Sequence, residues 1–150
     1  MKTQSILAFA ALFVVLACGL SAGFVRAENA NDPMLSPDAL AKASGEEIYQ
    51  HVCQGCHMPD GRGATGAGTY PALAGNAHLA SAHFTAVTVA LGRNNMPHFA
   101  AQPDLGGFEA FVTLHLDDRQ IAAVVNYVRS HFGNHYTDDV TPADIAALHP

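Results

Sequence analysis

The stretch that most constrains this chain is Cys53-Gln54-Gly55-Cys56-His57, in which two thiols stand two residues apart and a histidine follows the second directly. The whole chain of 150 residues has only one other cysteine. Two thiols and an imidazole so close along the chain indicate redox chemistry, a metal or a covalently held group. The fold of this chain therefore has to form around this stretch.

The first 27 residues have the pattern of an export signal. A basic start is followed by an uncharged run over residues 6–25, and Val25-Arg26-Ala27 precedes the polar Glu28. We expect a signal peptide at residues 1–27, cleavage after Ala27 and a periplasmic domain. Two alternatives remain open. The run of residues 6–25 is long enough for a membrane anchor, and Cys18 stands at the lipidated position of a sequence that loosely resembles a lipoprotein box.

The charge balance excludes one class of partner. Cleavage after Ala27 removes two of the 7 basic residues and none of the 13 acidic ones, which leaves a net charge of −8 with histidine neutral. A domain this acidic lacks the basic face of a nucleic-acid binder. It is expected to be repelled by anionic lipid and to favour partners with a basic patch, so membrane association is expected only if the N-terminal segment is retained or lipidated.

Three interpretations compete for Cys53, Cys56 and His57. A thioredoxin-like redox disulfide lies at the start of a helix after a strand, and no strand pattern precedes Cys53. A closed zinc site needs four ligands, and no second Cys or His pair stands at finger spacing. The third is covalent haem, whose two vinyl groups take up the thiols while the histidine becomes the proximal iron ligand. Haem is favoured, because the exported chain keeps no other cysteine.

The iron of such a haem needs a sixth ligand or an open site, and Met96 is the strongest candidate. It lies in a Gly-, Asn- and Pro-rich loop, where a methionine followed by Pro97 is poorly explained as core packing. Met58 adjoins the proximal histidine and cannot reach the opposite face, and Met34 lies in a Pro-flanked leader. His98 is the competing histidine, since it stands two residues from Met96.

Residues of about 44–132 resemble the class I cytochromes c. The positions that match family motifs are Gly45, Tyr49, Cys53-Gln54-Gly55-Cys56-His57, Asp60-Gly61-Arg62-Gly63, Pro71-Ala72-Leu73-Ala74-Gly75, Met96-Pro97, Val124 and Tyr127. The resemblance implies haem thioethers at Cys53 and Cys56 and iron ligation by His57 and Met96. It also implies that the carbonyl of Pro71 bonds the proximal imidazole and that Leu73 packs on the haem. The segments at residues 70–76 and 124–134 look most like bacterial monohaem cytochromes that serve periplasmic dehydrogenases.

The fold that the resemblance implies is all-α, with N- and C-terminal helices that cross around one covalently bound haem and with long loops. We expect a flexible leader at 28–43, a cytochrome c domain at 44–133 and a C-terminal tail with a short helix at 134–150. Gly45 is expected to lie against Tyr127, because a glycine is tolerable in a helix where another helix approaches closely.

The residue pattern predicts the same helices independently. Ser44 with Glu47 and Asp117 with Gln120 form capping boxes for the first and last long helices. A helix is predicted over residues 78–91, with Gly92 as its stop, and the last long helix is predicted to end at Gly133. Thr141, Pro142 and Asp144 predict the start of the short C-terminal helix.

The segment from Phe99 to His115 is longer than family members commonly have between the methionine and the last helix. Its apolar residues are expected either to fold back onto the core or to form a docking surface near the haem edge. The residues that hold the haem propionates stay open, with Arg62, Tyr70 and Arg93 as candidates by their chemistry.

Two classes of function remain. The favoured one is a single-electron carrier, free or as the cytochrome subunit of a dehydrogenase, which passes electrons to an oxidase or another cytochrome. A protein of this kind is not itself an enzyme. The alternative is a haem enzyme or gas sensor with an open distal site, against which Met96 argues.

Overall fold

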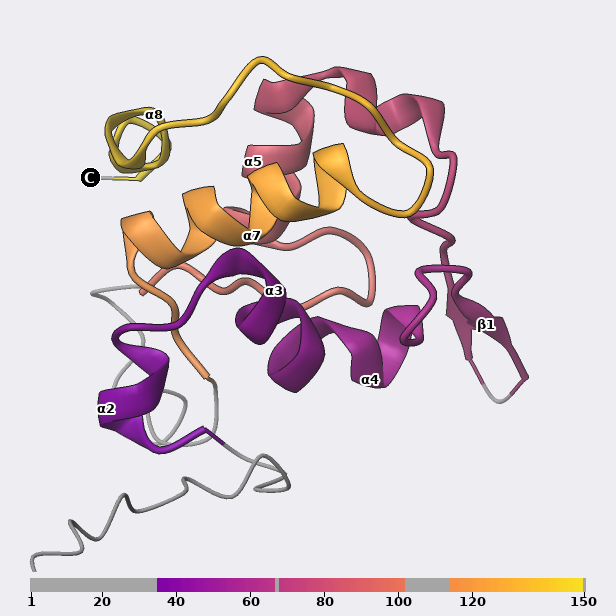
Figure 1. Cartoon of the computed structure of the whole chain (residues 1–150), viewed down its shortest axis with the longest axis horizontal. Helices are drawn as coiled ribbons and strands as arrows, with labels where there is room; N and C mark the ends of the chain where they lie inside the picture. Colours follow the sequence, from indigo (N-terminus) through magenta and orange to yellow (C-terminus); the bar gives the residue numbers. More distant parts are fainter. Residues whose placement is uncertain (1–34, 67, 102–113, 150) are drawn as a thin grey trace, which may run out of the picture. The chain divides into compact units, whose positions relative to one another are not determined.

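The computed structural model describes residues 35–66, 68–101 and 114–149. The predicted signal peptide, Met34 and most of the Phe99–His115 segment lie outside these ranges. Helices dominate the described part (Figure 1). They are α2 Pro37–Leu40, α3 Gly45–Ile48, the π-helical turn η1 Tyr49–Cys53, α4 Gln54–His57, the 3-10 turn η2 Ala77–Ala80, α5 Ala82–Leu91, α7 Asp118–Ser130 and α8 Pro142–Ala146. None of the helices described is long and apolar enough to cross a membrane.

Local hydrogen bonds fix where the principal helices begin. The Ser44 hydroxyl accepts from the Glu47 amide while the Glu47 carboxylate accepts from the Ser44 amide, and Asp117 and Gln120 repeat the arrangement ahead of α7. Thr141 does the same ahead of α8. The three predicted helix starts are therefore confirmed, and they satisfy amide groups that a helix N-terminus otherwise leaves unpaired.

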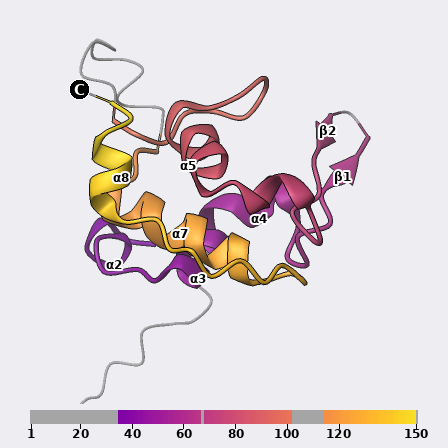
Figure 2. The ribbon, with the colours of Figure 1, turned by 90° about the horizontal axis from the view of Figure 1, so that it is seen from above.

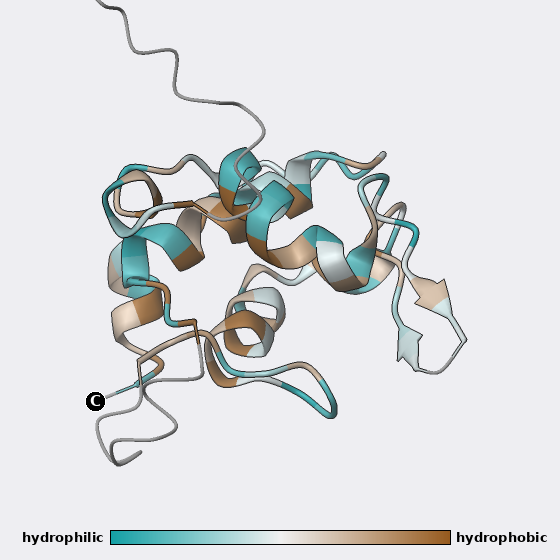
Figure 3. Ribbon diagram, turned by 90° about the horizontal axis from the view of Figure 1, so that it is seen from below, coloured by the Kyte–Doolittle hydropathy of each residue, from teal (hydrophilic) through white to brown (hydrophobic). Residues whose placement is uncertain are grey.

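The central element is α7, against which α3, α5 and α8 all pack (Figure 2). Its core-facing stripe is apolar and buried, as predicted: Ile121, Val124, Val125 and Val128. Ile48 and Tyr49 bring α3 and η1 into the same core. Figure 3 shows that hydrophobic residues gather where these helices meet, whereas the outer turns are hydrophilic. Burial of this apolar stripe favours the arrangement, because it removes apolar surface from water.

Gly45 is the point of closest approach between α3 and α7. A Cβ atom on Gly45 would stand 2.2 Å from the carbonyl oxygen of Ala123 and 2.9 Å from the Cβ of Tyr127. Real carbon atoms do not approach so closely, so only glycine lets the two helices cross here. The predicted contact with Tyr127 is confirmed.

Residues 35–43, in the leader predicted to be flexible, hold several contacts with the start of α7. The Gln120 side-chain amide donates to the Leu40 carbonyl at 2.6 Å, and the Arg119 guanidinium donates to the carbonyls of Ala41 and Ala43 at 2.6 and 3.3 Å. Leu35 and Leu40 pack against the core cluster. This part of the leader thus covers the N-terminal end of α7.

The tail after α7 is tied down through Arg129, whose side chain is 1% exposed. The guanidinium donates to the Leu79 carbonyl at 2.9 Å, to the Asp138 carbonyl, and to the Asp138 carboxylate at 2.5 Å. Asn126 adds a reciprocal pair with the backbone of Val140. These contacts lead the chain back along α7 to α8.

The elements differ from the predictions in three places. The segment 78–91 begins as the 3-10 turn η2, and only from Ala82 is it α-helical, because Ser81 caps α5. Helix α7 ends at Ser130, before the predicted Gly133, and the left-handed Phe132 and Gly133 turn the chain. The all-α prediction missed a small antiparallel pair, β1 Ala64–Thr65 and β2 Thr69–Tyr70, within the glycine-rich loop.

Candidate functional site

The two thiols and the histidine lie at the junction of two kinds of helix. Cys53 is the last residue of η1, and α4 carries Cys56 and His57. Cys53 is partly buried against the core and Cys56 is exposed, and neither forms a disulfide. A π-helical turn inside an α-helix is uncommon and is often found at functional positions, because it changes the direction of the side chains that follow it.

His57 has a defined orientation. Its side chain is buried, and its Nδ1 atom lies 2.9 Å from the carbonyl oxygen of Pro71. A carbonyl oxygen can only accept, so Nδ1 carries the proton of this bond, and in the neutral ring Nε2 then presents its lone pair. A histidine whose other ring nitrogen donates to a backbone carbonyl is the usual form of an imidazole that ligates a metal.

The loop that supplies the Pro71 carbonyl is folded back on the histidine segment. Gly63 donates from its amide to the His57 carbonyl at 3.0 Å, and the amides of Leu73 and Ala74 donate to the Gly61 carbonyl at 2.7 and 2.9 Å. A Cβ on Gly63 would collide with the Tyr70 carbonyl at 2.2 Å. Leu73 is partly buried and packs on the core cluster. Loop closure therefore places Pro71 and Leu73 beside the histidine segment.

Burial, assisted by the neighbouring Cys56 thiol, raises the pKa of Cys53 to about 12. Cys53 is thus a neutral thiol at physiological pH. A redox-active Cys-X-X-Cys pair needs the opposite, a thiolate stabilised by a lowered pKa. The environment of Cys53 argues against the redox-disulfide interpretation.

Met96 comes from a different element, the turn after α5. The backbones of Arg93 and Met96 pair through two hydrogen bonds of 2.9 and 3.1 Å, and the amides of Phe99 and Ala100 then bond to Val89 and Ala90. Gly92 ends α5 with a φ of 76°, and a Cβ there would meet the Met96 carbonyl at 2.8 Å. The methionine is thus held in a short, well-bonded turn, with its side chain partly exposed.

These residues fit the haem that the resemblance implies. His57 offers a neutral Nε2 lone pair for iron, and two thiols on adjacent turns are free to form thioethers. The candidate propionate partners are less decisive. Arg62 pairs with Asp60 at 3.4 Å on the surface, Arg93 lies over the Phe84 ring at 5.1 Å, and Tyr70 is exposed.

Sequence reasoning missed two features near this region. The first is Asn134, which is buried and links the loop that carries Leu73 to α7. Asn134 donates to the carbonyls of Leu73 and Val128, each at 2.9 Å, and accepts from the Asn76 amide at 3.1 Å. The second is His115, whose ring lies 6.1 Å from that of His98. Neither position belongs to a short motif, so no local signal marked it.

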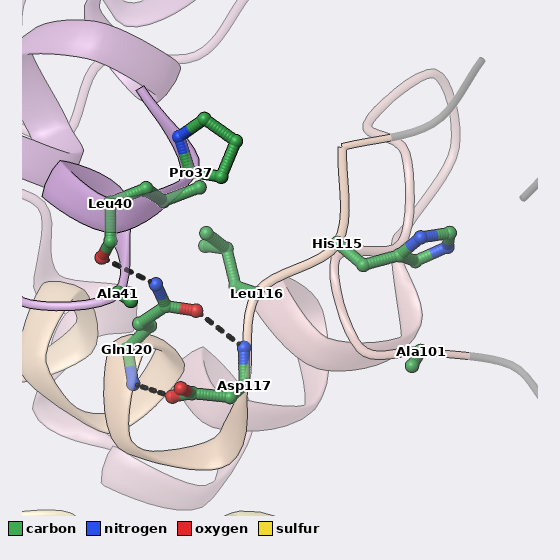
Figure 4. A pocket seen from close by; sticks show the side chains of 8 residues that line it. All are labelled: Pro37, Leu40, Ala41, Ala101, His115, Leu116, Asp117 and Gln120. Carbon is green, nitrogen blue, oxygen red and sulfur yellow. Dashed lines mark hydrogen bonds between the residues drawn. The ribbon is translucent and has the colours of Figure 1, made fainter. Parts of the chain in front are cut away.

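A pocket of about 340 Å³ lies between the leader and the start of α7 (Figure 4). It is lined by Pro37, Leu40, Ala41, Ala101, His115, Leu116, Asp117 and Gln120. None of the predicted iron ligands or thioether cysteines lines it, so this pocket is separate from the residues predicted to hold haem.

The chain matches the Cytochrome c family model over residues 42–132. It is 36% identical over 112 residues to the cytochrome c subunit of alcohol dehydrogenase (quinone) from Gluconobacter oxydans, which covers 70% of this chain and 22% of that protein. It is 31% identical over 110 residues to the fructose dehydrogenase cytochrome subunit of Gluconobacter japonicus, at 71% and 22% coverage. Cytochrome c-552 of Thermus thermophilus is 31% identical over 101 residues, at 64% and 65% coverage. The chain thus spans about a fifth of the length of the two dehydrogenase subunits.

Proposed function

Because this chain belongs to the cytochrome c family, whose members bind haem iron and transport electrons, we propose that it is a monohaem carrier that moves single electrons in the periplasm. The observation that supports this most directly is the hydrogen bond between His57 Nδ1 and the Pro71 carbonyl, within a Cys-X-X-Cys-His sequence. That bond fixes the tautomer that an iron-bound imidazole requires.

A covalently bound haem supplies an iron that accepts and releases one electron. In this proposal Cys53 and Cys56 hold the porphyrin by thioethers, His57 is the proximal ligand and Met96 the distal ligand. The neutral thioether of Met96 is a weak donor, so it favours ferrous iron and raises the reduction potential. Pro71 orients His57, and Leu73 gives the site an apolar wall that disfavours the extra charge of ferric iron.

The partner that we propose is a dehydrogenase, which donates electrons that the chain passes to a respiratory acceptor such as an oxidase or another cytochrome. The support is the similarity to the cytochrome subunits of alcohol and fructose dehydrogenases. In such an assembly the chain carries electrons and the dehydrogenase performs the chemistry on the substrate. It serves either as a free carrier or as a cytochrome subunit.

We propose the following organisation for the whole chain: a signal peptide at residues 1–27, a leader at 28–43, the haem domain at 44–133 and a C-terminal tail at 134–150. The contacts of residues 35–43 with α7 support a leader that is attached to the haem domain over its last part. N-terminal sequencing of the exported protein should give Glu28. An intact Met1 or an acylated Cys18 in the membrane fraction would instead indicate an anchored form.

The central test is whether haem is covalent. After acid–acetone extraction the haem should remain with the polypeptide, and the intact mass should exceed that of the cleaved chain by one haem. A Cys53→Ser and Cys56→Ser double variant should release any bound haem into the solvent. Extraction of free haem from the unaltered protein would contradict the proposal, and rapid binding of carbon monoxide to the reduced protein would contradict Met96 as a firm distal ligand.

A further inference from the structure

Two imidazole nitrogens are buried without a hydrogen-bond partner in the part of the chain that the structure describes. They are Nε2 of His98 and Nε2 of His115. The ring centres are 6.1 Å apart, with planes tilted by 37°. A buried polar atom without a partner is rare in folded proteins, because it loses its bonds to water and gains nothing in exchange. Two such atoms on neighbouring rings indicate that something polar bridges them.

The backbone holds the two histidines close to each other. Leu116 donates from its amide to the Phe99 carbonyl at 2.8 Å, and Ala100 and Leu116 form a parallel bridge. Each histidine is the immediate neighbour of one residue in that hydrogen bond. Phe99 and Ala100 are further bonded to the carbonyls of Val89 and Ala90 in α5. The backbone pairing of these two segments therefore holds the two histidines near each other.

A divalent transition-metal ion suits this pair in its donor atoms and in the separation of the two rings. Imidazole nitrogen is a preferred ligand of Zn²⁺ and Cu²⁺, with a zinc–nitrogen distance of about 2.0–2.1 Å. At that distance two imidazoles on one tetrahedral ion have ring centres roughly 5–6 Å apart. The observed separation of 6.1 Å between the ring centres is close to that range.

The surroundings favour a cation over an anion. The chain carries a net charge of −6, and Asp117 lines the same pocket as His115. In Figure 4 the His115 ring extends away from Pro37 and Leu40. No group of three or more His, Cys, Asp or Glu residues in the described part forms a metal cluster, so the protein would contribute two ligands here and water the others.

We propose that Nε2 of His98 and Nε2 of His115 bind one Zn²⁺ ion, separately from the haem iron. Such an ion joins the segment that follows Met96 to the segment that precedes α7. A metal that binds this native pair stabilises the native state, because the unfolded chain does not hold the two histidines together.

The test is isothermal titration of the mature, haem-loaded, untagged ferric protein with Zn²⁺ at neutral pH. One ion should bind per chain, and each of H98Q and H115Q should weaken that binding by about tenfold or more. The matched control is H131Q, since His131 stacks on Tyr127 and bonds the Tyr127 carbonyl outside this pair. Unchanged binding in both variants, loss in only one of them, or no binding to the unaltered protein would each overturn the proposal.

A second measurement does not require a variant. In the reduced protein, low-spin haem iron is diamagnetic, so the ring nitrogens of histidine can be followed by ¹⁵N NMR during addition of Zn²⁺. The Nε2 signals of two histidines should move together at one equivalent. Movement of neither signal, or of one alone, would overturn the proposed zinc site. The haem spectrum reports separately on iron ligation, so failure of zinc binding leaves the electron-transfer proposal intact.

Discussion

The orientation of a single imidazole depends on a carbonyl 14 residues further along the chain. His57 is held by Pro71, and Pro71 is held by a loop whose amides return to Gly61 and His57. Residues outside the Cys-X-X-Cys-His stretch thus decide which nitrogen of the His57 ring donates to the Pro71 carbonyl. Met96 is held differently, because it lies in a four-residue turn in which the backbones of Arg93 and Met96 bond to each other.

Met96 can be tested by substitution. If it is the distal ligand, the oxidised protein should show the weak red charge-transfer band of an iron–thioether bond, and Met96→Ala should abolish it. Met96→His should lower the reduction potential, because imidazole donates more strongly to ferric iron than a thioether does. Met58→Leu is the control and should retain the band. Survival of the band in Met96→Ala would identify another sulfur ligand.

Gly45 offers a stability test at the helix crossing. Gly45→Ala should lower the free energy of unfolding by about 1–3 kcal/mol, because a methyl group cannot fit against the Ala123 carbonyl without moving a helix. Denaturant unfolding followed by circular dichroism gives the difference. The control is Gly66→Ala, where a Cβ would meet nothing within 4 Å, and its effect should stay within about 0.5 kcal/mol. Equal effects of both substitutions would contradict the close crossing.

At the scale of elements, the tail and α7 form a clasp around a buried guanidinium. Arg129 is enclosed by the Leu79 and Asp138 carbonyls and by the Asp138 carboxylate, and its guanidinium carbon lies 5.7 Å from the centre of the Tyr136 ring. A buried cation is tolerable only with such a set of acceptors. These contacts therefore fix the position of the tail against α7 and η2.

The clasp should respond to acid. The hydrogen bond from Arg129 lowers the pKa of the Asp138 carboxyl below its ordinary value of 3.8. A lowered pKa in the folded state means that ionised Asp138 stabilises the protein above its unfolded pKa, and that this contribution is lost as the pH falls through the folded pKa. Asp138→Asn should therefore destabilise the protein at pH 7 and much less below pH 3.

Urea unfolding at several pH values measures this difference. Asp139→Asn is the neighbouring control, because Asp139 is exposed and makes no contact with Arg129 among the described hydrogen bonds. A loss of stability in Asp138→Asn that is the same at pH 7 and below pH 3 would mean that the carboxylate charge is irrelevant to the clasp.

The predictable elements are those whose signals are local. Ser44, Asp117 and Thr141 mark helix starts because a cap and its partner stand three residues apart. The burial of Arg129 was not predictable, since its acceptors lie in η2 and the tail, and neither is recognisable from spacing. The π-helical turn at Tyr49–Cys53 likewise has no sequence signature that periodicity would reveal.

In the candidate site, too, the residues that belong to a local motif were predictable and those brought together only by the fold were not. The motif predicted Cys53, Cys56 and His57 as a unit, and the resemblance added Pro71, whose contact with His57 the structure contains. The His98–His115 pair escaped prediction because 16 residues separate the two rings along the chain. Only the pairing of Phe99 with Leu116 brings them together.

At the scale of the whole molecule, acidic residues far outnumber basic ones. Cleavage after Ala27 would leave five basic residues against 13 acidic ones. Of those five, Arg129 is buried and Arg119 is committed to backbone carbonyls of the leader. The cleaved chain would therefore meet an approaching protein with a strongly negative net charge.

Electron exchange with the partner should therefore depend on salt. Opposite charges accelerate encounter by about 10 to 1,000-fold at low ionic strength, and the Debye length falls from about 30 Å at 0.01 M to about 8 Å at 0.15 M. Stopped-flow rates should drop steeply across that range. A flat profile would instead favour a permanent subunit held by apolar contacts, and Phe111→Asp, in the segment outside the described residues, should then release the chain from its partner.

The crossing of α3 with α7 joins segments of the chain that are synthesised at different times. Gly45 and Ala123 touch in the finished protein, yet 77 residues separate them along the sequence. A chain made from its N-terminus presents Cys53, Cys56 and His57 long before α7 exists to cover the helix that carries them. Until α7 is made, α3 and η1 lack the helix against which they pack, so the Cys53–His57 stretch is synthesised before the core that fixes its position exists.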